Sequence, residues 1–92
     1  MTDAGLAHLT GLTRLKFLEL NNTGVTDAGL ARLADLGNLE WVALNGTGVT
    51  DEGLAHLGGL PGLRMLDLAG TGVTDAGLDR LLESRPGLTA HR

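Results

Sequence analysis

Residues 39–49 read LEWVALNGTGV, and this stretch decides how the rest of the chain is organised. Its first, fourth, sixth and eleventh positions are apolar, and close copies run over residues 15–25 and 63–73. A short strand with this pattern can bury its edge only when neighbouring copies stack beside it. The chain is therefore predicted to be an array of repeats.

The period is 24 residues, because rows of equivalent residues recur at that spacing. A second word, Thr-Asp-x-Gly-Leu-x-x-Leu, alternates with the strand word. It begins at Thr2, Thr26, Thr50 and Thr74, whereas the strand words begin at Leu15, Leu39 and Leu63. Residues 1–92 are thus expected to form a single repeat domain, with a possible strand stub at Leu88.

Composition excludes several classes of function. The chain has no cysteine, so neither a disulfide framework nor a thiolate metal site is available. The formal net charge is -4 and the seven basic residues are scattered, which argues against nucleic acid. The start of the chain carries neither a basic segment nor a long apolar run, so we expect no signal peptide, no membrane span and a cytoplasmic protein.

Each Thr-Asp word is predicted to begin a helix. The threonine hydroxyl can accept a hydrogen bond as N-cap, and the aspartate that follows suits the positive end of the helix dipole. The glycine three residues after the threonine costs roughly 1 kcal/mol of helix propensity, so its repetition predicts close packing of helix on strand layer. Helices are expected near residues 3–10, 27–35, 51–58 and 75–84.

The strand words alternate apolar and polar positions, which predicts parallel strands near residues 16–20, 40–44 and 64–68. Strands lie about 4.8 Å apart and helices about 10 Å apart, so the stack must curve. The predicted fold class is α/β: a short right-handed solenoid with strands on the concave face and helices on the convex face. The residues expected to be buried in the strands are Leu18, Leu20, Val42, Leu44, Leu66 and Leu68.

At these positions the chain resembles the leucine-rich repeat family, whose strand signature is LxxLxLxxNxL. The stretch at residues 39–49 matches that signature, with threonine in place of the usual asparagine, and the Thr-Asp word is similar to those of bacterial and F-box-associated repeats. The resemblance implies that Thr23, Thr47 and Thr71 replace the family's asparagine ladder, which bridges successive turns. It also implies a module that binds other proteins.

The two ends of the array differ. Asp79 replaces a small alanine, the last helix is longer and more polar, and Leu88 arrives one residue late, all of which is typical of a terminus. His91 then falls where a buried leucine belongs, so we expect at most a stub of a fourth strand. The N-terminal end opens with a full repeat word, and its flank is expected to expose parts of Leu6, Leu9 and Leu12. Self-association, a missing upstream segment or tolerated exposure would each account for this flank.

Signals for chemistry are weak. His8 and His56 are equivalent positions with Arg32 between them, which favours solvated helix surfaces over a metal site. The aspartates at 3, 27, 51 and 75 already have a role at helix starts, so a calcium site is disfavoured. No phosphate-binding or nucleophile motif is present, so the sequence predicts neither a cofactor nor an enzyme.

The positions that point outward from the strands are free to specialise, because packing does not restrict them. The predicted partner-binding residues are Phe17, Trp41 and Met65 in one lateral row, Lys16, Glu40 and Arg64 beside it, and Glu19 and Asp67 beyond. Ala43 lies between the last two. An apolar stripe flanked by charges is typical of a protein-binding patch. The same stripe would also stabilise the sheet through cross-strand contacts without any partner.

Two functions therefore remain open. The first is a protein-interaction module that binds its partner on the concave strand face, as one piece of a longer array. The second is a structural or self-assembling unit whose uncapped N-terminal flank meets another copy. An adaptor associated with an enzyme is a third reading, by analogy with the F-box relatives, but the chain contains no F-box helices.

Overall fold

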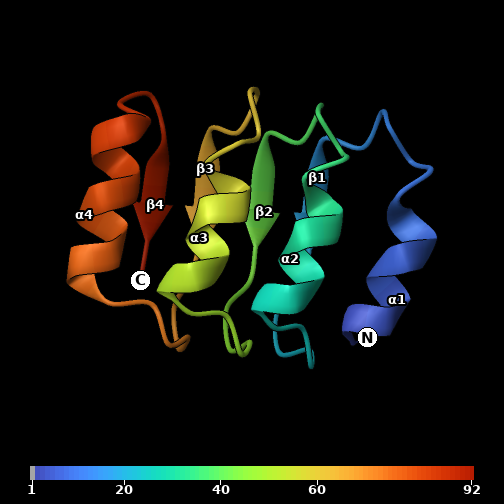
Figure 1. The fold of residues 1–92 in the computed structure, drawn as a ribbon, viewed down its shortest axis with the longest axis horizontal. Helices are drawn as coiled ribbons and strands as arrows, with labels where there is room; N and C mark the ends of the chain where they lie inside the picture. Colours follow the sequence, from blue (N-terminus) through green and yellow to red (C-terminus); the bar gives the residue numbers. More distant parts are fainter. Residues whose placement is uncertain (1) are drawn as a thin grey trace.

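The computed structural model describes residues 2–92, in which helices and strands alternate and stack side by side along the longest axis (Figure 1). The helices lie in one layer and the strands in a second. The elements are α1 (Asp3–Leu6), the 3-10 turn η1 (Ala7–Leu9), β1 (Phe17–Glu19), α2 (Asp27–Leu33), β2 (Trp41–Ala43), α3 (Asp51–Leu57), β3 (Met65–Asp67), α4 (Asp75–Ser84) and β4 (Thr89–His91). The fold is therefore the predicted α/β solenoid of parallel strands and helices.

The strands form one parallel sheet in the order β1-β2-β3-β4. Its register repeats the 24-residue period, because Phe17 pairs with Trp41 and Trp41 pairs with Met65. Equivalent residues of successive repeats therefore lie side by side across the sheet. Residues that recur every 24 positions in the sequence therefore form lateral rows across the sheet.

The hydrophobic core consists of leucine and valine rows contributed by every repeat. Leu20, Leu44 and Leu68 form one such row, and each is at most 3% exposed. The expected burial of Val42 and Leu66 is also found, whereas Leu18 is only partly buried. Leu18 lies on β1, the first strand of the sheet, so a neighbouring strand covers it from one side only.

The Thr-Asp words join successive helices, and among them Thr74 alone also caps its own helix with its hydroxyl. The Asp27 carboxylate accepts the backbone N–H of Thr50 at 2.7 Å through Oδ1 and the Thr50 hydroxyl through Oδ2. Asp3 binds Thr26 in the same way, and Asp51 binds Thr74. The predicted hydroxyl cap is found only at Thr74, which accepts from Gly77 N–H at 3.2 Å. The prediction was wrong for the other threonines, because the N–H of the glycine three residues later donates at 3.0 Å to the threonine's backbone carbonyl and not to its hydroxyl.

The glycine of each word is small because the preceding repeat approaches it. A Cβ at Gly53 would overlap the Asp27 carboxylate and come within 2.7 Å of Leu30 Cδ1. The same crowding is found at Gly29, from Asp3 and Leu6. The close packing is therefore helix against preceding helix, and the expected helix-on-strand contact was the wrong pair of elements.

The loops after the strands are tied together by asparagine. Asn21 Oδ1 accepts the N–H of Asn45 at 2.9 Å, and Asn45 Oδ1 accepts the N–H of Ala69 at 2.8 Å. Thr47 instead closes its own loop, because its hydroxyl donates to the Leu44 carbonyl at 2.7 Å. Thr23 and Thr71 do likewise. The expectation that these threonines bridge the turns was therefore wrong, and the ladder lies two residues earlier in the word.

The C-terminal repeat carries a complete fourth strand and not a stub. Thr89 pairs with Met65 and His91 pairs with Asp67, so the period of 24 residues continues to the end of the sheet. His91 consequently lies on an exposed row, and Ala90 takes the place of the buried Leu66. The expected position of His91 was wrong because it followed the displaced Leu88 instead of the backbone register.

Two arginines close this end of the stack. The Arg85 guanidinium donates to the carbonyls of Gly58 at 2.8 Å and Leu63 at 3.3 Å, which belong to the preceding repeat. Arg92 forms an ion pair with Asp75. Asp75 is the equivalent of Asp3, Asp27 and Asp51, so Arg92 takes the position that a threonine occupies on those carboxylates.

The N-terminal flank is open, although not at every residue that the sequence predicts. Leu6 is fully buried, and its expected exposure was wrong because its Cδ1 packs against Gly29 of the next repeat. Leu12 is 51% exposed, and Leu9, Leu15 and Leu18 are partly buried. We define these four leucines as the N-terminal flank.

Candidate functional site

The predicted binding residues within the strands alternate with the core residues Leu18, Val42 and Leu66, so they lie on the face of the sheet that the helices do not cover, which we call the strand face. Phe17, Trp41 and Met65 are aligned by the sheet register, one on each of three adjacent strands. The parallel pairing likewise aligns Glu19 with Ala43 and Asp67. Lys16, Glu40 and Arg64 precede the three strands by one residue.

The two aromatic rings contact each other across β1 and β2. Their centroids are 6.0 Å apart and their planes meet at 81°, which is an edge-to-face pair. Phe17 is nevertheless 64% exposed and Trp41 is 42% exposed. The cross-strand stacking expected between these two residues is present, yet it leaves much of both rings in contact with solvent.

A hydrogen bond fixes the orientation of the indole ring. Trp41 Nε1–H donates to Asp67 Oδ2 at 2.9 Å, reaching diagonally from β2 to β3. A buried or half-buried indole N–H requires such a partner, since it is a donor only. The ring is held over the sheet by both neighbouring strands, by Phe17 on one side and by Asp67 on the other.

The charged rows are only partly neutralised by one another. Lys16 Nζ lies 3.8 Å from Glu40 Oε2, so the expected cross-strand pairing is formed at one place. Exposed pairs of this kind contribute about 0–1 kcal/mol. Arg64 is exposed just before β3, and Glu19 Oε1 accepts a hydrogen bond from Asn21 Nδ2 at 3.2 Å. Since that donor is neutral, the negative charge of Glu19 is not compensated by it.

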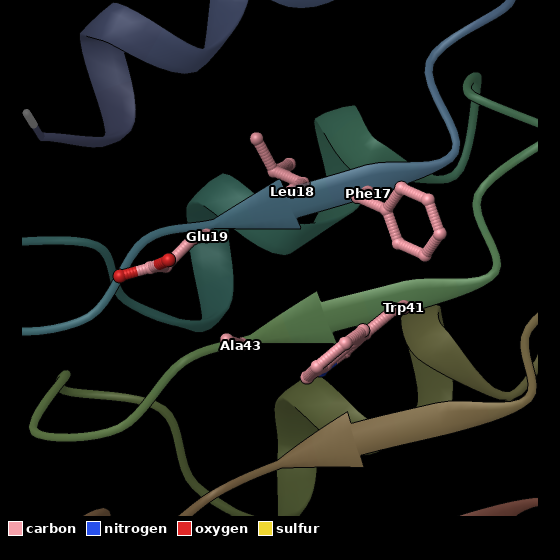
Figure 2. Close-up of a pocket in the computed structure, with 5 residues that line it drawn as sticks. All are labelled: Phe17, Leu18, Glu19, Trp41 and Ala43. Carbon is pink, nitrogen blue, oxygen red and sulfur yellow. The ribbon is translucent and has the colours of Figure 1, made fainter.

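A shallow pocket of about 300 Å³ opens on this face. Figure 2 shows Phe17 and Glu19 extending from β1, with Trp41 and Ala43 on β2 beside them. Leu18 completes the lining. The space is open at Ala43 because its side chain is a single methyl group. The equivalent residues on the adjacent strands, Glu19 and Asp67, have larger side chains.

The structure brings together some of the predicted residues and separates others. Phe17, Glu19 and Trp41 line the pocket. Met65 and Asp67 lie in the same lateral rows on β3, whereas Lys16, Glu40 and Arg64 precede the strands and do not line the pocket. Leu18, predicted as a core residue, was missed as a lining residue. Ala43 was placed in the row between Glu19 and Asp67 but was not named among the binding residues, although a small residue between two larger ones in a lateral row indicates a gap.

The histidines of the helix layer do not form a metal site. His8 in η1 and His56 in α3 are both exposed. Within residues 2–92 there is no cluster of three His, Asp or Glu side chains that could hold a metal ion. Across the same part of the chain, no helix is long and apolar enough to cross a membrane.

Comparison with solved structures identifies the fold. A leucine-rich repeat protein of Leptospira interrogans superimposes with a TM-score of 0.63 over 94% of this chain and 27% of its own length, at 16% sequence identity. An internalin of Listeria monocytogenes superimposes with a TM-score of 0.62 over 92% of this chain and 30% of its own, at 23% identity. No family model and no curated protein matches the sequence. The chain has the leucine-rich repeat fold and spans less than a third of either structure.

Proposed function

We propose that this leucine-rich repeat chain is a protein-interaction module that binds its partner on the strand face, around Phe17 and Trp41. One observation supports the proposal most strongly. The chain contains one Phe, one Trp and no Tyr, and both aromatic side chains are exposed at a single place on the surface. Aromatic side chains are the largest source of apolar burial, so their absence from the core indicates another use.

The surroundings of the aromatic pair support the same proposal. Aromatic anchors ringed by polar and charged side chains are typical of the centre of a protein interface. Here Lys16, Glu40 and Arg64 lie on one side of the aromatic row, and Glu19 and Asp67 lie on the other. The proposed partner is a protein, and the proposed role includes no catalysis and no cofactor.

A random peptide library displayed on phage and selected on the immobilised chain tests this function. Selected clones should lose about 30-fold in affinity for Trp41→Ala, the factor that corresponds to about 2 kcal/mol. They should bind His56→Ala, a change on the exposed surface of α3, as tightly as the original chain. Equal binding by all three proteins would contradict a strand-face site.

The folded state of Trp41→Ala must be measured in parallel. Loss of the edge-to-face contact and of the Asp67 hydrogen bond should lower stability by about 1 kcal/mol and leave the leucine core intact. Circular dichroism and denaturant melts separate this small loss from unfolding. A folded variant that no longer binds supports the proposed site.

The open N-terminal flank favours self-association as a second candidate function. Leu33, Leu36 and Leu39 of the second repeat are at most 1% exposed, whereas the equivalent Leu9, Leu12 and Leu15 are not buried. A second copy that covers these leucines would remove apolar surface from water. The oligomeric state decides between the two functions.

A further inference from the structure

We propose that the pocket over β1 and β2 selects a positively charged side chain of the partner, arginine or lysine. This inference rests on the proposed function and adds the chemistry of the group that is recognised. It follows from three features of the strand face: an apolar wall, an uncompensated carboxylate at one end of it, and the exposed aromatic rings at the other.

The shape of the pocket suits a long side chain with an apolar stem. Phe17 and Glu19 lie on the same face of β1, two residues and therefore roughly 6.6 Å apart along the strand. Next to Glu19, on β2, the space above the methyl group of Ala43 is open. Arginine and lysine have stems of three to four methylene groups that pack on apolar surface while the charged head reaches a polar partner.

The carboxylate of Glu19 provides the charge at the end of this path. It is exposed and has one hydrogen bond, at Oε1, from the neutral Asn21 side chain. A carboxylate has about four acceptor sites on two oxygens, so it retains capacity for a guanidinium or an ammonium group. A bound anionic side chain would be repelled at the same position.

The aromatic end of the pocket also favours a cation. The faces of Trp and Phe rings attract Arg and Lys electrostatically, most strongly for Trp. Trp41 cannot serve an acidic ligand as a donor, because its Nε1–H is already bonded to Asp67. Lys16 is paired with Glu40, which reduces the positive potential next to the rings. The chain as a whole has a net charge of -4.

A purely apolar side chain fits the pocket less well. It would pack against the rings and Ala43, but it would also displace water from the Glu19 carboxylate without replacing its hydrogen bonds. Desolvation of an unpaired charge is unfavourable. A neutral isostere of arginine, citrulline, keeps the shape but replaces one NH2 group of the guanidinium by a carbonyl oxygen and so removes the charge. It is therefore the decisive comparison.

The experiment uses the fluorescence of Trp41, which is the only tryptophan in a chain without tyrosine and so reports on this site alone. Capped pentapeptides with glycine at every position except the middle are titrated into the chain at low salt. The middle residue is arginine, citrulline or leucine. Arginine should bind at least about 5-fold more tightly than citrulline or leucine, and added salt should reduce this preference.

Two variants assign the preference to the pocket. Glu19→Gln keeps the size of the side chain and should abolish the difference between arginine and citrulline. Glu52→Gln, the same change at an exposed position of α3, should leave it intact. Circular dichroism confirms that both variants are folded.

The opposite results would overturn the inference. Equal binding of arginine and citrulline, tighter binding of leucine, or no binding of the arginine peptide up to about 10 mM would each do so. These outcomes differ from failure of the proposed function. Phage-selected ligands that need Trp41 but contain no basic residue would support the strand-face site and exclude the cation, whereas ligands indifferent to Trp41 would exclude both.

Discussion

Asp51 accepts two hydrogen bonds from Thr74, the backbone N–H at 2.8 Å and the hydroxyl at 2.5 Å. Hydrogen bonds from Thr74 lower the pKa of the Asp51 carboxyl below its ordinary value of 3.8, and the hydroxyl contributes more than the backbone N–H. The positive charges of Arg80 and Arg92 lower this pKa further. Hydrogen bonds to a carboxylate favour its ionised form. The residue that joins α3 to α4 is therefore also sensitive to acid.

The sign of this dependence follows from linkage. A carboxyl whose pKa is lower in the folded state than in the unfolded state binds fewer protons when folded, so it stabilises the fold above pH 4 or so. The stabilisation is lost as the pH falls from there through the folded pKa. We expect Asp51→Asn to lose less stability than the original chain between about pH 5 and pH 3.

Thermal melts over this pH range measure the effect, and Thr74→Val provides a second variant. It removes the hydroxyl donor but leaves the carboxylate, so it should also weaken the acid dependence. If Asp51→Asn and the original chain lost the same stability on acidification, the Asp51–Thr74 contact would not be its source.

The sequence predicts which residues form lateral rows, but it does not predict which atoms their side chains bind. Asp27 and Thr50 were recognised as recurrent, yet the sequence does not show that they bond to each other across 23 positions. The local alternative, in which each residue serves its own helix terminus, is equally consistent with the spacing. Packing of successive helices decides between the two, and that packing is a property of the stack.

The strands differ in how many neighbouring strands they have. β2 has a neighbour on both sides, whereas β1 has a neighbour on one side only. Leu44 follows β2 and is fully buried, with β1 and β3 as neighbours. Leu18 lies on β1 and is only partly buried. A cavity in a closed position is costlier than one in a position that water can reach or that can relax.

Replacing Leu44 with alanine should therefore lower the free energy of unfolding by about 2–5 kcal/mol. Leu18→Ala removes the same atoms from a more open site and should cost less than half as much. Denaturant melts of the two variants give the comparison directly. A loss below about 1 kcal/mol for Leu44→Ala, or equal losses for both, would mean that the middle repeat is not the best packed.

The strands and helices agree with the sequence wherever the 24-residue period is unbroken, because hydrophobic spacing and backbone register then indicate the same residues. They disagree at β4, where Leu88 departs from the period. The hydrogen bonds of the sheet, from Thr89 N–H to the Arg64 carbonyl at 2.8 Å and from Leu68 N–H to the His91 carbonyl at 2.7 Å, maintain the register there. The sequence shows the displaced leucine but not these bonds.

For the strand-face site, the register shows the lateral row of Phe17 and Trp41 and its charged borders. It does not show the bond between Trp41 and Asp67, since the two residues are 26 positions apart and diagonal in the sheet. It also does not show which part of the face is hollow. Both depend on side-chain orientation, which the alternation of a strand leaves undetermined.

The whole molecule is asymmetric along the stack. At one end Arg92 binds the Asp75 carboxylate, the group that would bind the threonine of another repeat. At the other end the N-terminal flank carries a half-exposed Leu12. Head-to-tail stacking of copies would require Arg92 to leave Asp75, so the self-association proposed above would join two N-terminal flanks.

Sedimentation velocity at several protein concentrations tests this directly. If the flank associates, the original chain should shift towards a dimer as concentration rises. Leu12→Glu should then return it to the monomer with little change in its melting curve, because the side chain is exposed. Leu6→Ala should instead lower stability, since Leu6 is fully buried.

Phe17→Glu is the matched control on the strand face, where the side chain is also exposed. If Phe17→Glu dissociates the dimer and Leu12→Glu does not, the contact lies on the strand face. If the original chain is a monomer at every concentration, self-association is excluded and the strand face is available to a partner.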